Sequence, residues 1–187
     1  MTSKQKLFEA TLRLAGSRGL VGITVDEIAA EAGVAKGTVY YNFGSKDGLI
    51  DALLRYGVGQ LADRLRAVAG EPDPVAALES MVDAGLAFIA EYRGFSQLLV
   101  SEMWRTAGQW RETLTLLREE IISIVREQLR LVADAGRLRD DIEIPAAAAG
   151  LFGTLLVIAL DWQVFNPDRP RAEVLDSIMH LARGLAR

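Results

Sequence analysis

The sequence contains no cysteine and only one histidine, His180, among its 187 residues. Without thiols the chain forms neither disulfides nor thiolate metal sites. It also lacks a cluster of metal-ligating residues and a glycine-rich loop of the kind that holds phosphates. We therefore expect no metal and no cofactor.

The sequence gives little support for catalysis. Asp176 and Ser177 precede His180 by about one helical turn. Neighbours on one helix face do not form a nucleophile, a base and an orienting residue that converge on a substrate. We expect the protein not to be an enzyme, and a helical enzyme ranks third, after a transcriptional regulator and a ligand-binding or carrier protein.

Long hydrophobic runs are also missing. The N-terminus has no apolar segment typical of a signal peptide. The longest apolar run, residues 146–160, lies between Pro145 and Asp161 and is shorter than the ~20 residues that span a bilayer. We interpret it as a buried helix and expect a cytoplasmic protein.

Acidic residues outnumber basic residues over the whole chain, which gives a formal net charge of −4. However, residues 1–66 hold nine Lys or Arg and seven Asp or Glu, a net +2, whereas the remainder holds 12 and 18, a net −6. The distribution of charge matters more than its total for DNA binding. A mildly basic N-terminal part is therefore compatible with a DNA-binding function.

Residues 24–46 contain the most informative pattern, a pair of short helices. Thr24 and Glu27 have the spacing of a capping box, and Gly33 suits the left-handed residue that ends a helix. A second helix of about two turns follows, from residue 35 or 36 to residue 42 or 43. The pattern is typical of a helix-turn-helix, whose second helix lies in the DNA major groove. Glycine-containing helix pairs also occur in other all-helical proteins.

Two residues in this segment favour DNA binding over simple packing. Gly37 costs about 1 kcal/mol relative to alanine inside a helix, which close approach of the backbone to DNA would explain. Lys46 follows the N-cap residue Ser45 and lies in a first helical turn, where a cation is unfavourable unless a phosphate shares the site. The residues predicted to contact DNA are Thr24, Lys36, Gly37, Thr38, Tyr40, Tyr41, Asn42 and Lys46.

The same segment resembles the N-terminal domain of TetR/AcrR-family transcriptional regulators. Ala35 departs from the family pattern, which commonly has a capping serine there, and Asn42 stands where histidine or an aromatic residue is common. The preferred DNA sequence therefore does not carry over. The matching residues are Thr24, Ile28-Ala29, Ala32-Gly33-Val34, Lys36-Gly37-Thr38, Val39, Tyr40, Phe43, Ser45-Lys46 and Leu49, with Leu7, Ala10, Leu14 and Gly19 upstream.

The resemblance implies an all-α protein with an N-terminal three-helix helix-turn-helix domain and a larger C-terminal helical domain for ligand binding and dimerisation. We predict a DNA-binding domain over residues 1–46, a connecting helix over 47–70, and an effector-binding and dimerisation domain over 71–187. A Pro/Gly cluster at 70–74 is the clearest linker. Helices are expected at residues 46–68, 74–91, 94–105, 108–135, 145–166 and 171–186.

The C-terminal part supports two predictions about binding. The helix at 145–166 is apolar on nearly every side, and with the last helix it can form half of a four-helix dimer interface, where TetR-like proteins dimerise. Aromatic and aliphatic residues in the middle of the chain come from helices that enclose the pocket in similar regulators, although each also suits ordinary core packing. The predicted dimerisation residues are Leu151, Leu155, Ile158, Leu175, Ile178 and Ala182. The predicted effector-binding residues are Phe88, Phe95, Leu99, Met103, Trp104, Trp110, Leu114 and Phe152.

These observations predict a homodimeric, ligand-responsive transcriptional regulator. We expect a repressor that binds a palindromic double-stranded DNA operator and is released by a small, mostly apolar effector. The alternative is an all-helical ligand-binding or carrier protein with a DNA-binding-like head. Binding to genomic DNA fragments distinguishes the two.

Overall fold

The structure is a computed structural model that describes residues 2–18, 22–103 and 107–185, with the backbone alone at residues 18, 102–103 and 107–110. Helices and turns make up these parts, which contain no strand, and the all-α prediction is confirmed. The chain divides into two compact units. Unit 1 comprises Met1–Gly57 with Tyr92–Leu114, and unit 2 comprises Val58–Glu91 with Thr115–Arg187.

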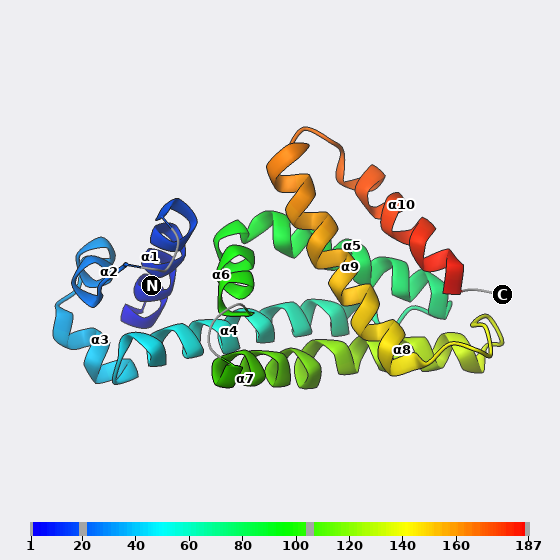
Figure 1. The fold of residues 1–187 in the computed structure, drawn as a ribbon, viewed down its shortest axis with the longest axis horizontal. Coiled ribbons are helices and arrows are strands. Elements are labelled where there is room, and N and C mark those ends of the chain that lie inside the picture. Colours follow the sequence, from blue (N-terminus) through cyan, green and yellow to red (C-terminus); the bar gives the residue numbers. More distant parts are fainter. Residues whose placement is uncertain (1, 19–21, 104–106, 186–187) are drawn as a thin grey trace. The chain divides into compact units, whose positions relative to one another are not determined.

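Unit 1 contains the three helices predicted at the N-terminus. Its helices are α1 (Ser3–Arg18), α2 (Val25–Ala32), α3 (Lys36–Phe43), the first part of α4 (Lys46–Val68), α6 (Arg93–Met103) and most of α7 (Ala107–Leu117). Helix α1 packs against α2, α3 and α6 (Figure 1). Leu7, Ile28 and Val39, one from each of the first three helices, have no exposed surface. Their burial joins the helix pair to α1 and fixes its geometry.

Helix α6 lies in unit 1, although the predicted domain division assigned it to the C-terminal part. A Cβ atom on Gly94 would lie 2.7 Å from the backbone oxygen of Leu12 in α1, so the two helices approach closely there. The ring of Phe95 lies directly on the backbone of α4 at Gly57. Packing units and functional domains need not share boundaries, so the functional division at residues 46 and 70 stays a prediction.

Unit 2 is built around α5, which contacts three other helices. Besides the second part of α4, its helices are α5 (Pro74–Glu91), the π-helical turn η1 (Arg118–Ile122), α8 (Ser123–Asp134), α9 (Ile144–Phe165), α10 (Arg171–Ala182) and the short 3₁₀ turn η2 (Arg183–Leu185). Helix α5 packs against α8, α9 and α10 (Figure 1). One apolar cluster joins the α8 side of this unit to α9. It comprises Leu78, Val125, Leu129, Val132, Leu138, Ala148 and Leu151.

The predicted helix over residues 108–135 is interrupted by the π turn η1. A π turn inserts an extra residue into an α-helix and often occurs at functional sites. Ile121 lies in this turn and is buried. The C-terminal end follows the prediction, because Gly136 has a φ of 70° and the Arg137 amide donates to the Val132 carbonyl, as in a Schellman motif.

Helix α9 agrees with its predicted bounds, 145–166, to within one residue at each end, and extends beyond the apolar run at 146–160. It has 22 residues and a mean hydropathy of 1.9 in its most apolar window, enough by length and composition to cross a membrane, with 33% of that window buried. The apolar run alone therefore understated the length of the apolar helix. Core helices of soluble proteins have the same length and composition, and α9 packs on α5, α8 and α10.

Candidate functional site

The turn between α2 and α3 is held by the caps predicted from sequence. The Thr24 amide donates to Glu27 Oε2 over 2.8 Å, and the Glu27 amide donates to Thr24 Oγ1 over 3.2 Å. Gly33 has a φ of 64°, and its amide donates to the carbonyls of Ala29 and Ala30. Since both ends of α2 are fixed by local hydrogen bonds, the angle at which α3 leaves the turn is defined.

Helix α3 is packed on one side and open on the other. Val39 is fully buried, whereas Tyr41 is 90% exposed. Lys36, Gly37 and Tyr40 also lie on the exposed side, so four of the eight predicted DNA-contacting residues share one outward face of α3. Contact of this face with DNA stays a prediction.

Two of the predicted DNA-contacting residues on α3 are half-buried, and one of them has a partner within its own helix. The side-chain amide of Asn42 donates to the Thr38 carbonyl over 2.7 Å, and Thr38 is half-buried as well. Ala35, at the N-cap of α3, provides no side-chain hydrogen bond, as its departure from the family pattern predicts. The first turn of α3 therefore lacks the usual cap.

Lys36, the first residue of α3, pairs with an acidic residue of α2. Its Nζ lies 2.8 Å from Asp26 Oδ2, and both side chains are more than half exposed. The hydrogen bond and the charge of Asp26 raise the pKa of Lys36 above its ordinary value. The sequence analysis missed this pair, because the two residues are ten positions apart across a turn and no local periodicity links them.

The junction of α3 and α4 is tightly packed. Ser45 caps α4 by accepting a 2.9 Å hydrogen bond from the Gly48 amide, as predicted. The Phe8 ring lies 5.6 Å from that of Phe43 and 5.4 Å from that of Tyr56, so α1 contacts both the end of α3 and α4. Lys46, in the first turn of α4, is half-buried beside this junction. These contacts hold α1 against the end of α3 and against α4.

Replacing Gly37 by alanine separates a packing role from a DNA-contacting role. An added Cβ meets no atom within 4 Å, so Gly37→Ala is expected to stabilise the free protein by about 1 kcal/mol through helix propensity. If the α3 backbone approaches DNA closely, the same methyl group weakens operator binding. Thermal unfolding and fluorescence anisotropy measure the two effects. Operator affinity equal to or above that of the parent would contradict the close approach.

The predicted effector-binding residues fall into different parts of the chain. Phe88 and Phe152 are buried in unit 2, whereas Phe95 and Leu99 are buried in unit 1, where Leu114 is half-buried. Trp104 lies outside the described residues, as do the side chains of Met103 and Trp110. The assignment of this whole set to one pocket stays a prediction.

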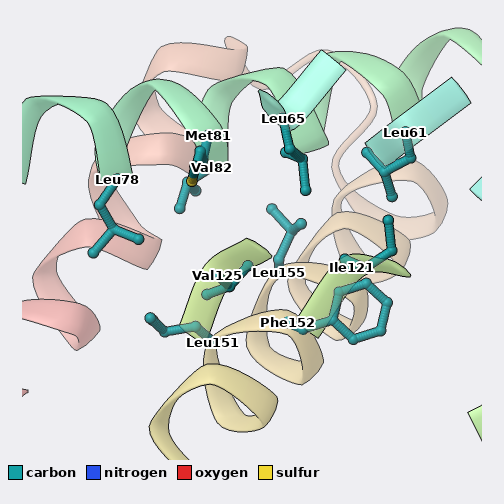
Figure 2. Close-up of a pocket in the computed structure, with 10 residues that line it drawn as sticks. All are labelled: Leu61, Leu65, Leu78, Met81, Val82, Ile121, Val125, Leu151, Phe152 and Leu155. Carbon is teal, nitrogen blue, oxygen red and sulfur yellow. The ribbon is translucent and has the colours of Figure 1, made fainter. Parts of the chain in front are cut away.

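Unit 2 contains a small apolar cavity whose lining includes one of the predicted effector-binding residues, Phe152 (Figure 2). Its volume is about 30 Å³, far below the roughly 300–1,000 Å³ of a typical ligand pocket. Ile121 of the π turn and Leu155 of α9 both point into it. The lining residues are Leu61, Leu65, Leu78, Met81, Val82, Ile121, Val125, Leu151, Phe152 and Leu155. None of them is charged, and two of them, Leu151 and Leu155, were predicted from the sequence to lie in the dimer interface.

Three of the predicted dimerisation residues are buried within the protomer. Leu151, Leu155 and Ile178 lie in the core of unit 2, whereas Ile158, Leu175 and Ala182 are half-buried. Other apolar residues of the same two helices are open to solvent. They are Val157, Val164 and Phe165 on α9, and Leu181 on α10. Val157 and Val164 are seven positions apart and therefore share a helix face.

Comparisons with known proteins agree with this architecture. Residues 3–53 match the family model described as "Bacterial regulatory proteins, tetR family". The HTH-type transcriptional regulator BetI of Burkholderia cenocepacia (strain HI2424) is 37% identical over 83 residues, and the match covers 43% of each chain. BetI of Serratia proteamaculans (strain 568) is 28% identical over 97% of this chain and 93% of the relative. Among solved structures, the regulator FadR from Bacillus subtilis in complex with stearoyl-CoA has a TM-score of 0.84 at 18% identity, covering 95% of this chain and 96% of that one.

Proposed function

Because this chain belongs to the TetR family of bacterial transcriptional regulators, we propose that it binds operator DNA as a homodimer and releases it when a small apolar effector binds. The observation that carries the proposal is the outward face of α3, with Lys36, Gly37, Tyr40 and Tyr41 exposed and Val39 buried beneath them. A recognition helix needs this arrangement to enter the major groove.

Regulation is favoured over the carrier alternative by both the relatives and the residues. Each relative reported above is named a transcriptional regulator, and a carrier has no need for an uncapped helix with a lysine and two tyrosines turned outward. The proposed regulator acts in the cytoplasm as a repressor. A dimer with two-fold symmetry implies a roughly palindromic operator with half-sites about one helical turn, or a multiple, apart.

The effector is proposed to be a molecule with a long uncharged hydrocarbon part, such as a fatty acyl chain. The cavity lining has no charged side chain to pair with an ionic group, and burying an unpaired charge there would be costly. The Bacillus subtilis FadR structure, whose fold this chain shares, contains stearoyl-CoA. Any polar head group would then lie outside the lining described here.

Widening of the cavity provides the proposed link between effector and operator. At about 30 Å³, the cavity accepts an acyl chain only after its helices move apart, so the ligand stabilises a different conformation. Leu61 and Leu65 of α4 belong to the lining, whereas the first turn of the same helix adjoins the end of α3. Movement of α4 is therefore the proposed route to the recognition helix.

Addition of palmitoyl-CoA is expected to lower operator affinity at least tenfold, which requires about 1.4 kcal/mol of coupling. Linkage demands that operator DNA weaken ligand binding by the same factor. Anisotropy titrations of labelled operator measure the effect of the ligand on operator affinity. Calorimetric titrations of the ligand measure the effect of the operator on ligand affinity. A ligand that binds equally well with and without operator would show that this cavity is not the switch.

A cavity-filling variant and a matched control sharpen this test. Leu155→Phe places a larger ring at the cavity and should abolish the response to palmitoyl-CoA while the free protein still binds operator. Leu131→Phe makes the same chemical change on the partly exposed face of α8 and should respond like the parent. Loss of the response in both variants would argue against the cavity.

A further inference from the structure

We infer that Asp26 is a specificity-determining residue of the DNA-binding face and acts by positioning Lys36. This inference rests on the proposed DNA-binding function, and goes beyond it by giving a role to a residue that the predicted contacts did not include. The two atoms that carry it are Lys36 Nζ and Asp26 Oδ2, which lie 2.8 Å apart. The pair joins the first turn of α2 to the first turn of α3.

Asp26 compensates for the unfavourable position of Lys36. The N-terminus of a helix carries partial positive charge and disfavours a cation, and the first turn of α3 has neither an acidic residue nor a side-chain cap. Asp26 supplies the missing negative charge from α2, and its carboxylate accepts a 2.8 Å hydrogen bond from Lys36 Nζ. Because both side chains are largely exposed, solvent screens the pair, and another anion can displace the carboxylate.

DNA supplies such an anion. A phosphate that binds Lys36 competes with Asp26 for the ammonium group and lies close to the Asp26 carboxylate, which repels it. That repulsion penalises a phosphate contact by Lys36 whatever the base sequence. When Lys36 remains paired with Asp26, its ammonium group is held in place and reaches phosphates less readily. A base edge that offers hydrogen-bond acceptors at that position then becomes its favoured contact.

Asp26 should therefore weaken binding to arbitrary DNA more than binding to the operator. Non-specific affinity depends almost entirely on phosphate contacts, whereas operator affinity also includes base contacts. Specificity is the ratio of operator affinity to non-specific affinity, so a residue that lowers the non-specific affinity more than the operator affinity raises specificity. If the Asp26–Lys36 ion pair only stabilised the packing of α2 on α3, its loss would change thermal stability without changing this ratio.

The test replaces Asp26 by asparagine and measures two affinities over a range of salt concentrations. Asp26→Asn should bind a random duplex at least threefold more tightly than the parent, with a steeper salt dependence by roughly one released ion. Its preference for a selected operator of equal length should fall by a similar factor. Circular dichroism establishes that the variant is folded.

Glu31→Gln is the matched control. Glu31 of α2 forms an ion pair of the same length, 2.8 Å, with Arg13 of α1 in the same unit. Its replacement removes the same charge and weakens an ion pair that is also open to solvent on both sides. It should leave the specificity ratio at the parent value, and an effect equal to that of Asp26→Asn would overturn the inference in favour of a general charge effect.

A double-mutant cycle with Lys36→Ala decides whether Asp26 acts through Lys36. In the Lys36→Ala background, Asp26→Asn removes only the carboxylate's own repulsion of the phosphates, so its gain in random-duplex affinity should be smaller than in the parent and the specificity ratio should stay unchanged. An equal gain and an equal fall in specificity in both backgrounds would overturn the positioning role. Failure of the unchanged protein to bind any duplex would contradict the proposed function itself, whereas normal operator binding with no effect of Asp26→Asn would contradict this inference alone.

Discussion

Leu181→Glu is expected to convert the protein from a dimer to a monomer and to lower operator affinity at least ~100-fold, a loss of about 2.7 kcal/mol. Leu181 is 64% exposed on α10, and Val157 is 65% exposed on the neighbouring α9. Large apolar side chains open to solvent on the two proposed interface helices are suited to burial against a second copy. A carboxylate at that place would be buried without a partner on association, which is unfavourable.

This position gives a clearer test than the residues predicted from sequence. A charge at Leu155 or Ile178 would enter the protomer's own core and would unfold unit 2, so loss of dimer would not report on the interface. Leu131→Glu serves as the control, since Leu131 is 44% exposed on α8, which is not one of the two proposed interface helices. Sedimentation velocity and anisotropy provide the measurements. A Leu181→Glu protein that stays dimeric and binds operator normally would refute the proposed interface.

Gly48→Ala is expected to lower operator affinity at least tenfold and to destabilise the protein by about 1–3 kcal/mol, as overpacking does. A Cβ on Gly48 would overlap the backbone carbonyl oxygen of Phe43, the last residue of α3. Backbone atoms have no alternative rotamer, so the end of the recognition helix must shift. A shift there disturbs the alignment of Tyr40 with DNA, even though Gly48 itself makes no predicted contact.

Gly59→Ala in the same helix is the control. A Cβ on Gly59 meets no atom within 4 Å, so this variant should gain up to about 1 kcal/mol from helix propensity and bind operator like the parent. Denaturant unfolding gives the change in free energy, and gel shifts give the affinity. If Gly48→Ala binds operator as tightly as Gly59→Ala, the tight junction does not position α3.

Features set by neighbouring residues were predictable from the sequence. The capping box at Thr24 and Glu27, the left-handed Gly33 and the cap at Ser45 each depend on residues three or four positions apart, and all three are present. The bounds of α4 and α5 also agree with prediction, because a Pro/Gly cluster separates them. Local hydrogen bonds leave recognisable residue types at fixed spacings, which makes them readable without a structure.

Features that depend on distant packing were not predictable. The position of α6 in unit 1 depends on Gly94 meeting Leu12, two residues 82 positions apart in the numbering. The residues of α9 are apolar on nearly every side of the helix, so the sequence does not show which side is buried. Only the structure distinguishes buried Leu155 from exposed Val157. The ion pair of Asp26 and Lys36 likewise depends on how the turn at Gly33 brings two helix ends together.

Selection of binding sites from fragmented genomic DNA by the purified protein tests the central claim most directly. The account predicts that enriched fragments share an inverted repeat whose half-site centres are about one helical turn or a multiple apart, and that each site binds a whole number of dimers. Enrichment should fall steeply as salt rises, because phosphate contacts release counterions. A selection with no enrichment over bulk DNA at low salt, or with enriched single half-sites bound by monomers, would contradict it.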